Sequence, residues 1–432
     1  MAFSSSVPLP LIYPKGKIGF SYNNHCMLGK WSARSRASSF NRRALRTARA
    51  TAMTAIEAVP KQEPSPWLML PPEIEAGTTT YKFYSLADDK VETLCLSDEI
   101  RDLRLTCRGS SHGWLALLSQ HDDGFFLYNP ISRRHIKLPS ILNLPTYLSY
   151  HYKGILSSPK SVNKVILSCS PDEDEENCRV VIVRDYGNPL AFCCPGRSKE
   201  WTLMFDENRD YKDCVYSTTL KLFFAINFNY YERRLETWDL GDLSSPKLIK
   251  VDKFNYFTTI ERFLLNKCVE IKHLVVVDED LLLVIQYIML RVGPDVLHHE
   301  QLDERKPDSR RYMTIGFYIF KYDDSEQGKF KYLDSSSLGD LAIFVGLHNH
   351  SVAIQATEFP GVKPNSIYFT DGNYTGELEG DESYDDDGFL CGLGHDIGIY
   401  NYQDKTVSPC YYPCDVQSLK TILPAPIWFF PN

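Results

Sequence analysis

The sequence predicts an all-β protein that forms a single β-propeller of six blades. Short apolar runs end repeatedly at Gly, Asn, Pro or Asp, which is typical of antiparallel strands. Aromatic residues make up 13% of the 432 residues, and Tyr and Phe favour strands over helices. Strand pairs recur along the chain, and two of the intervals are about 45 residues, the length of a four-stranded blade.

The clearest pattern covers residues 107–139. An apolar run at residues 113–118 is followed by a second run at 125–128, which ends at Asn129 and Pro130. Residues 134–138 then alternate, with Ile136 and Leu138 on one face. A continuous apolar run indicates a strand that is covered on both faces. We therefore predict three consecutive short strands here.

Six strand pairs are expected, each with a polar turn between its strands: residues 81–96, 125–139, 190–204, 235–251, 315–333 and 397–412. The wider intervals need insertions, for which three polar and charged stretches are available: residues 172–176, 291–311 and 377–388. C-terminal strands would complete the first blade and close the ring. We place the propeller at residues 81–432 and interpret the proline-rich residues 56–80 as a linker.

Residues 1–55 carry nine basic residues and no acidic one, and serine is abundant. This composition is typical of a disordered organellar transit peptide, and it does not distinguish mitochondrion from chloroplast. A basic tail that binds nucleic acid is the alternative. The remaining residues carry 47 − 9 = 38 basic and 55 acidic side chains, a formal net charge of −17. We therefore expect no nucleic-acid partner.

The longest apolar run, residues 281–290, contains Gln286 and is too short to cross a bilayer, so no membrane insertion is expected. The twelve cysteines include no pair separated by two residues. Scattered cysteines within apolar runs indicate reduced, buried thiols in a reducing compartment. Cys410 and Cys414 form the best candidate for a redox pair. The domain is expected to be a monomer.

Several motifs occur in a fixed order between residues 65 and 430: residues 67–71, 109–115, 127–130, 136–139, 190–201, 338–344, 359–371, 398–401 and 426–428. This ordered set resembles the plant F-box-associated β-propeller family known as domain of unknown function 295. The resemblance implies a propeller that binds proteins and catalyses nothing. Many members carry an F-box, a helical module of some forty residues, before the propeller. Five prolines in residues 56–80 oppose such helices, so we expect an organellar-type member without an F-box.

Three motifs could carry chemistry. Residues 109–113 fit the nucleophile pattern G-x-S-x-G around Ser111, but a strand-like run follows where a hydrolase needs a helix. His348 and His350 lack further ligands at zinc spacing, and His395 with Asp396 precedes a strand as turn residues would. The sequence therefore predicts turns at all three places, and no catalytic, cofactor-binding or metal site.

The expected function is a non-enzymatic, protein-binding propeller that is imported into an organelle. The alternative is a cytosolic or nuclear substrate receptor of a ubiquitin ligase, and an enzyme with its site on the propeller axis remains a third class. Residues 291–311 and 377–388 are either recognition loops or solvated insertions.

Overall fold

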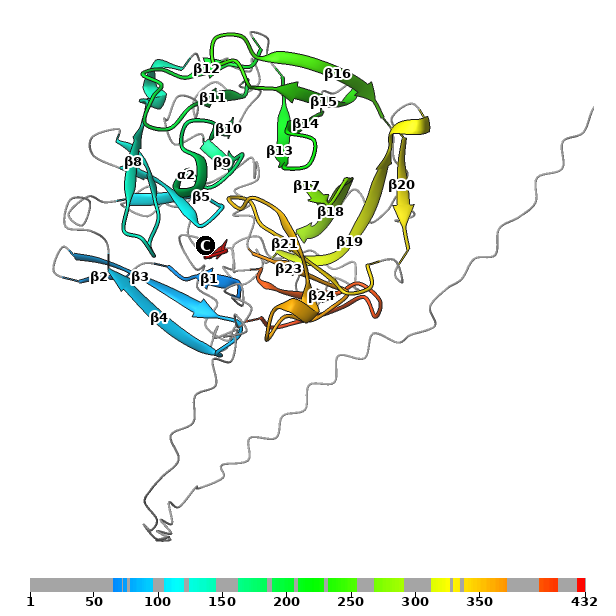
Figure 1. Ribbon diagram of the computed structural model, residues 1–432. Coiled ribbons are helices and arrows are strands. Elements are labelled where there is room, and N and C mark those ends of the chain that lie inside the picture. Colours follow the sequence, from blue (N-terminus) through cyan, green and yellow to red (C-terminus); the bar gives the residue numbers. More distant parts are fainter. Residues whose placement is uncertain are drawn as a thin grey trace, which may run out of the picture. The chain divides into compact units, whose positions relative to one another are not determined.

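The computed structural model confirms the all-β prediction, and Figure 1 shows six sheets arranged around a common axis. All described residues belong to one compact unit, residues 61–432. The described residues are 65–71, 73–75, 78–95, 105–119, 124–144, 162–184, 189–205, 209–228, 232–254, 268–290, 312–326, 329–334, 338–370, 396–410 and 426–431.

Sheets 2 to 5 each contain four antiparallel strands that follow one another from the axis outwards. Sheet 2 contains β5 (Leu105–Ser111), β6 (Trp114–Ser119), β7 (Phe125–Tyr128) and β8 (His135–Leu138). Sheet 3 contains β9 (Val162–Leu167), β10 (Val180–Arg184), β11 (Ala191–Cys193) and β12 (Thr202–Leu203). Sheet 4 contains β13 (Tyr211–Ser217), β14 (Leu222–Phe228), β15 (Arg233–Asp239) and β16 (Lys247–Lys253). Sheet 5 contains β17 (Cys268–Val277), β18 (Asp280–Leu290), β19 (Tyr312–Asp323) and β20 (Lys329–Leu333).

Sheets 1 and 6 have five strands each. Sheet 6 contains β21 (Leu341–Val345), β22 (Val352–Gln355), β23 (Ser366–Phe369), β24 (Gly398–Asn401) and β25 (Thr406–Ser408). Its strands β21 and β23 are parallel, whereas its other pairs are antiparallel. Sheet 1 contains β1 (Trp67–Met69), β2 (Glu73–Glu75), β3 (Thr78–Ser85), β4 (Lys90–Cys95) and β26 (Ile427–Phe429).

Sheet 1 closes the ring in the way the sequence predicts, because β26 pairs with β1. Its N-terminal boundary differs from the prediction. Strands β1 and β2 lie within residues 56–80, the expected linker, and both pair with β3. Leu68 and Met69 are buried in the sheet, which explains why an apolar centre stands between prolines. The propeller therefore begins before Tyr81, at Trp67 or earlier.

All six predicted strand pairs are present, and each supplies two neighbouring outer strands of a different sheet. The short apolar runs form these strands because alternate side chains pack against both neighbouring sheets. Helical structure is confined to single turns in the described part of the chain: α2 (Pro171–Asp174), η1 (Ile141–Asn143), η3 (Asp324–Glu326) and η4 (Ala356–Glu358). The acidic stretch 172–176, expected to be a loop, thus begins with a helical turn. No described helix is long and apolar enough to cross a membrane.

The innermost strands of sheets 2 to 5 run in the same direction. Residues 109 and 111 of β5 lie against residues 165 and 167 of β9 in that order. Residues 213 and 219 of sheet 4 likewise contact residues 274 and 278 of sheet 5. The connections β5–β6, β9–β10, β13–β14 and β17–β18 therefore share one end of the propeller. We call this end the turn face.

A segment of sheet 6 reaches across to other sheets. We call residues 346–351, between β21 and β22, the axial segment. Its Asn349 forms a parallel bridge with Ser110 of β5, and His350 N–H donates to the Ser110 carbonyl over 3.0 Å. The Asn349 amide also donates to the Trp428 carbonyl of β26 over 2.9 Å. The axial segment thus ties sheet 6 to sheets 1 and 2 beside the ring closure.

Candidate functional site on the propeller axis

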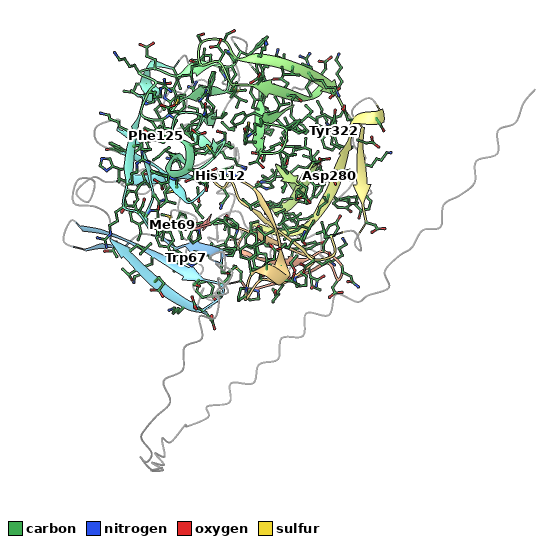
Figure 2. All side chains as sticks on the ribbon, in the orientation of Figure 1. Trp67, Met69, His112, Phe125, Asp280 and Tyr322 are labelled. Carbon is green, nitrogen blue, oxygen red and sulfur yellow. The ribbon has the colours of Figure 1, made fainter. Side chains whose placement is uncertain are left out.

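Ser111 lies at the end of β5, where the chain turns sharply into β6. The two turn residues, His112 and Gly113, have φ angles of 49° and 74°. Two consecutive left-handed residues between paired strands form a hairpin turn that matches the twist of the sheet. The sequence prediction of a turn at G-x-S-x-G is therefore confirmed, and no helix follows Ser111. Figure 2 shows His112 closer to the centre of the ring than Phe125.

The turn brings Ser111 together with two histidines. Its Oγ lies 3.0 Å from Nδ1 of His112 and 3.3 Å from Nδ1 of His350, which belongs to the axial segment. The two imidazole rings stack, with centroids 5.4 Å apart and planes 22° from parallel. Ser111 Oγ also accepts a hydrogen bond of 3.1 Å from the N–H of Leu167 in β9. Two motifs that the sequence treats as separate turns thus form one cluster of polar side chains.

His348 belongs to the same axial segment and contacts sheet 3. Its Nδ1 lies 2.6 Å from the carbonyl oxygen of Asn163. Because a carbonyl can only accept, Nδ1 must carry the proton. Burial, with smaller contributions from Arg108 and Lys164, lowers the pKa of His348 to about 4, although the bond to Asn163 opposes this.

The other two histidines of the cluster are also held neutral. Burial lowers the pKa of His112 to about 4. Burial lowers the pKa of His350 well below its usual value, and the neighbouring His112 and Lys164 lower it further. Neither imidazole is therefore protonated at neutral pH.

A buried ion pair lies beside this cluster and joins three sheets. Lys164 Nζ of β9 lies 2.8 Å from Asp213 Oδ1 of β13, and both side chains are at most 5% exposed. Asp213 also accepts hydrogen bonds from the N–H groups of Leu274 and Cys214, of 2.7 and 2.8 Å. Burial raises the pKa of Asp213, whereas Lys164 and the two N–H groups oppose that rise. The carboxylate thus links the innermost strands of sheets 3, 4 and 5.

A second chain of polar side chains joins sheets 5 and 6. His273 Nε2 lies 3.3 Å from Gln286 Oε1, and the Gln286 amide donates to Thr314 Oγ1 over 2.6 Å. The Thr314 hydroxyl in turn donates to Asp396 Oδ2 over 2.5 Å. Burial lowers the pKa of His273 to about 3. Asp396, expected to be a turn residue, therefore connects two sheets, while His395 lies outside the described residues.

The geometry of the Ser111 cluster does not form a nucleophile, base and orienting acid. Ser111 Oγ is engaged by a backbone N–H, and each histidine directs the same Nδ1 atom at it. In a catalytic triad the histidine uses its second nitrogen to hold a carboxylate. Burial is the main cause of the lowered pKa of His350, and no carboxylate is among the groups that shift it. In the part of the chain that is described, no group of three His, Cys, Asp or Glu side chains could hold a metal ion.

The sequence reasoning missed most of this site. It gave no role to Lys164, Asp213, His273 or Thr314, and noted Gln286 only as a polar residue within an apolar run. The available signal was a charged or amide residue in the middle of each apolar strand, which must find a partner when it is buried. The sequence could not indicate which partner.

Comparisons with known proteins agree with this fold. Residues 83–401, more than half of the chain, match the family described as KIB1-4 beta-propeller. The chain is 28% identical over 194 residues to the F-box/kelch-repeat protein At1g57790 of Arabidopsis thaliana, which covers 42% of this chain and 48% of that protein. It is 44% identical over 71 residues to the putative F-box protein At1g65770 of the same plant, which covers 16% of this chain and 19% of that protein. The chain therefore matches about half of the first relative and a fifth of the second.

Similarity to solved structures is weak. A chain of a nidogen/laminin complex has a TM-score of 0.30 and 8% identity, covering 62% of this chain and 92% of that chain. The beta-propeller domain of Myceliophteria thermophila Cps50 (Swd1) has a TM-score of 0.28 and 8% identity, covering 62% of this chain and 86% of that one. These scores carry no functional information. The match over residues 83–401 establishes that the chain belongs to the KIB1-4 beta-propeller family, a plant family with F-box-associated relatives, and the closed ring of six sheets agrees with it.

Proposed function

We propose that this propeller is a non-enzymatic protein-binding module that works inside a mitochondrion or chloroplast. The observation that carries the proposal is that the polar side chains around the axis make hydrogen bonds between sheets. Ser111, Asn349 and Asp213 each bind a different sheet from the one that carries them. Side chains that hold sheets together are not free to bind a substrate. Recognition is then left to surface loops and turns, as in other rigid scaffolds.

The finer family placement is part of the same proposal. We infer that the chain is an organellar-type member of the F-box-associated family known as domain of unknown function 295. Support comes from the ordered motifs and from the acid-free, basic residues 1–55. Those residues lie outside the described part of the chain, as do the candidate recognition loops 291–311 and 377–388. Their roles stay predictions.

Affinity capture from isolated organelles tests the binding role and locates the surface. The tagged full chain would be compared with two surface variants. One replaces residues 291–311 by a short Gly/Ser linker, and the other carries Ile131→Glu and Leu220→Glu on exposed turn-face residues. We expect one surface variant to lose the captured protein at unchanged melting temperature. Ser111→Ala, the matched axial control, should retain it.

Two results would contradict the proposal. Loss of the partner in Ser111→Ala but in neither surface variant would place recognition on the axis. Hydrolysis of an ester or amide substrate by the purified chain, abolished by Ser111→Ala, would show that the protein is an enzyme.

A fusion of residues 1–60 to a fluorescent protein tests the location. Entry into mitochondria or chloroplasts supports import, and it also distinguishes the two organelles. A diffuse cytosolic signal would contradict it and would leave the binding role to be tested in the cytosol.

A second candidate function is favoured by the names of the relatives. One relative is named an F-box/kelch-repeat protein and the other a putative F-box protein. The chain would then be a cytosolic or nuclear substrate receptor of a ubiquitin ligase. Capture of ligase subunits with the full chain from cytosol, and not from organelles, would support this alternative.

A further inference from the structure

Two cysteines face each other where the β9–β10 ladder ends at the turn face. Leu167 pairs with Val180, and Ser168 N–H donates to the Arg179 carbonyl over 2.9 Å. The next opposed residues are Cys169 and Cys178. In an antiparallel pair, hydrogen-bonded and non-hydrogen-bonded positions alternate, so the cysteines occupy the closer, non-hydrogen-bonded kind. Such pairs have Cα atoms about 4.5 Å apart, within the range that a disulfide requires.

The two thiols are in contact. Cys178 Sγ lies 3.3 Å from the carbonyl oxygen of Cys169, both side chains pack into the same apolar cluster, and each thiol shifts the pKa of the other. Cys178 is fully buried, while Cys169 is half-buried and therefore accessible to a small solute. One thiol can thus react with solvent species, and the other is placed to react with it.

The chemistry of the pair is asymmetric. Hydrogen bonding from the Cys178 thiol, with help from the Ser168 hydroxyl, lowers the pKa of Cys169 to about 7. The same contact and burial raise the pKa of Cys178. Burial raises the pKa of Cys107 to about 11, and it also raises that of Cys194. Because the thiolate is the reactive form, Cys169 is the most reactive of these four thiols.

We propose that Cys169 and Cys178 form a reversible disulfide in response to hydrogen peroxide. The Cys169 thiolate attacks one peroxide oxygen, the O–O bond breaks, and a sulfenic acid and hydroxide result. The Cys178 sulfur then attacks the sulfenic sulfur and gives up its proton, and water leaves as the S–S bond forms. In sum, two thiols and one hydrogen peroxide give one disulfide and two waters. A small thiol reductant reverses the reaction.

The loop that the disulfide would close connects three sheets. Ser170 Oγ accepts a 3.1 Å hydrogen bond from the indole N–H of Trp114 in sheet 2. Asp172 accepts hydrogen bonds from Asn129 and Arg134, which flank the β7–β8 turn of sheet 2. Arg179 donates to carbonyls of the β15–β16 connection in sheet 4. Oxidation would therefore fix the part of the turn face where sheets 2, 3 and 4 meet.

Peptide mass spectrometry tests the proposal directly. Lys164 and Arg179 bound a tryptic peptide, residues 165–179, that contains both cysteines and no other. The reduced full chain would be titrated with hydrogen peroxide and blocked with an alkylating agent before digestion. We expect this peptide to carry no alkyl group and to weigh two hydrogens less than the reduced peptide, at peroxide concentrations roughly tenfold lower than those that oxidise the other buried cysteines. Dithiothreitol should restore alkylation.

Variants separate this pair from its neighbour Cys194, whose Sγ lies 3.4 Å from the Glu176 carbonyl of the same loop. Cys194→Ser should leave the disulfide unchanged. Cys178→Ser should leave a sulfenic acid on Cys169 that a dimedone probe labels, and Cys169→Ser should abolish the reaction. A trivalent arsenical bridges two neighbouring thiols. It should bind the reduced chain without substitutions and protect both cysteines of residues 165–179 from alkylation.

Three results would overturn the proposal. They are full alkylation of both cysteines after oxidation, a disulfide between Cys178 and Cys194, and failure of the arsenical to protect the peptide. The first and third need no variant, so they remain decisive if a substituted chain does not fold. None depends on the proposed binding role.

Discussion

Two of the buried polar clusters around the propeller axis hold sheets together by different means. Lys164 and Asp213 use opposite charges, with two backbone N–H groups completing the carboxylate's hydrogen bonds. Ser111, His112 and His350 use neutral groups, and the two histidines are partly exposed. A buried ion pair contributes little net stability, but removal of one partner leaves an isolated charge. A neutral cluster tolerates substitution better and instead depends on pH.

The largest effect is expected from breaking the ion pair on one side. Asp213→Ala would leave the Lys164 ammonium buried without its partner and two N–H groups without an acceptor. We expect it to lower the free energy of unfolding by about 3–5 kcal/mol, measured by urea denaturation. The control is the double variant Lys164→Met with Asp213→Asn. It leaves no isolated charge, and the Asn side chain keeps one oxygen that can accept from a backbone N–H. A double variant as unstable as the single one would show that the charge is not the cause.

The neutral cluster and His348, which belongs to the same axial segment as His350, should make the protein sensitive to acid. The pKa values of His112 and His348 are lowered to about 4 in the folded protein, from about 6.5 when unfolded. The unfolded chain therefore binds more protons between these values, and stability is lost as the pH falls from about 6.5 to 4. Each histidine contributes at most about 1.4 kcal/mol per pH unit.

Urea denaturation across that pH range would measure the effect, and His348→Gln should flatten the slope. The same variant at pH 8, where the histidines are neutral in both states, reports the loss of packing and of the contact with the Asn163 carbonyl. An unchanged slope in His348→Gln would refute the assignment of acid sensitivity to this residue.

The smallest effect is expected at Ser111. Ser111→Ala removes the acceptor of the Leu167 N–H but leaves no charge buried. We expect a loss of about 1–2 kcal/mol in the free energy of unfolding, seen as a lower melting temperature. Ser110→Ala, next to it in β5, is the matched control because the contact of Ser110 to the axial segment is made by its backbone carbonyl. A loss as large as that of Asp213→Ala would remove the distinction between the two clusters.

Local patterns in the sequence were sufficient to predict the sheets. Each predicted pair is joined by a turn whose residues, such as Asn129 with Pro130, determine its position. The prolines around residues 67–69 favour a linker, whereas the segment pairs with β3 and, at the other end of the sequence, with β26. No local rule connects strands so far apart.

The axial clusters were unpredictable for the same reason. Ser111 and His350 meet only because sheet 6 contributes a segment that lies against β5. The sequence does not indicate the cysteine pair for another reason, because its two members are brought together by the register of a single hairpin. Cys169 and Cys178 have an arbitrary spacing until the register of the β9–β10 hairpin is known. The pair that the sequence favoured was Cys410 with Cys414; Cys410 is buried and Cys414 lies outside the described residues.

The closure of sheet 1 has a consequence for how the chain folds. Trp67 pairs with Phe429, a separation of 429 − 67 = 362 residues. Contacts between such distant residues make folding slow, because the chain must lose much entropy before they form. On the ribosome, sheets 2 to 5 can form as their hairpins emerge, whereas sheet 1 must wait for the residues of β26. Until then β1 exposes the edge that later pairs with β26, and chaperones would have to protect this edge from other chains.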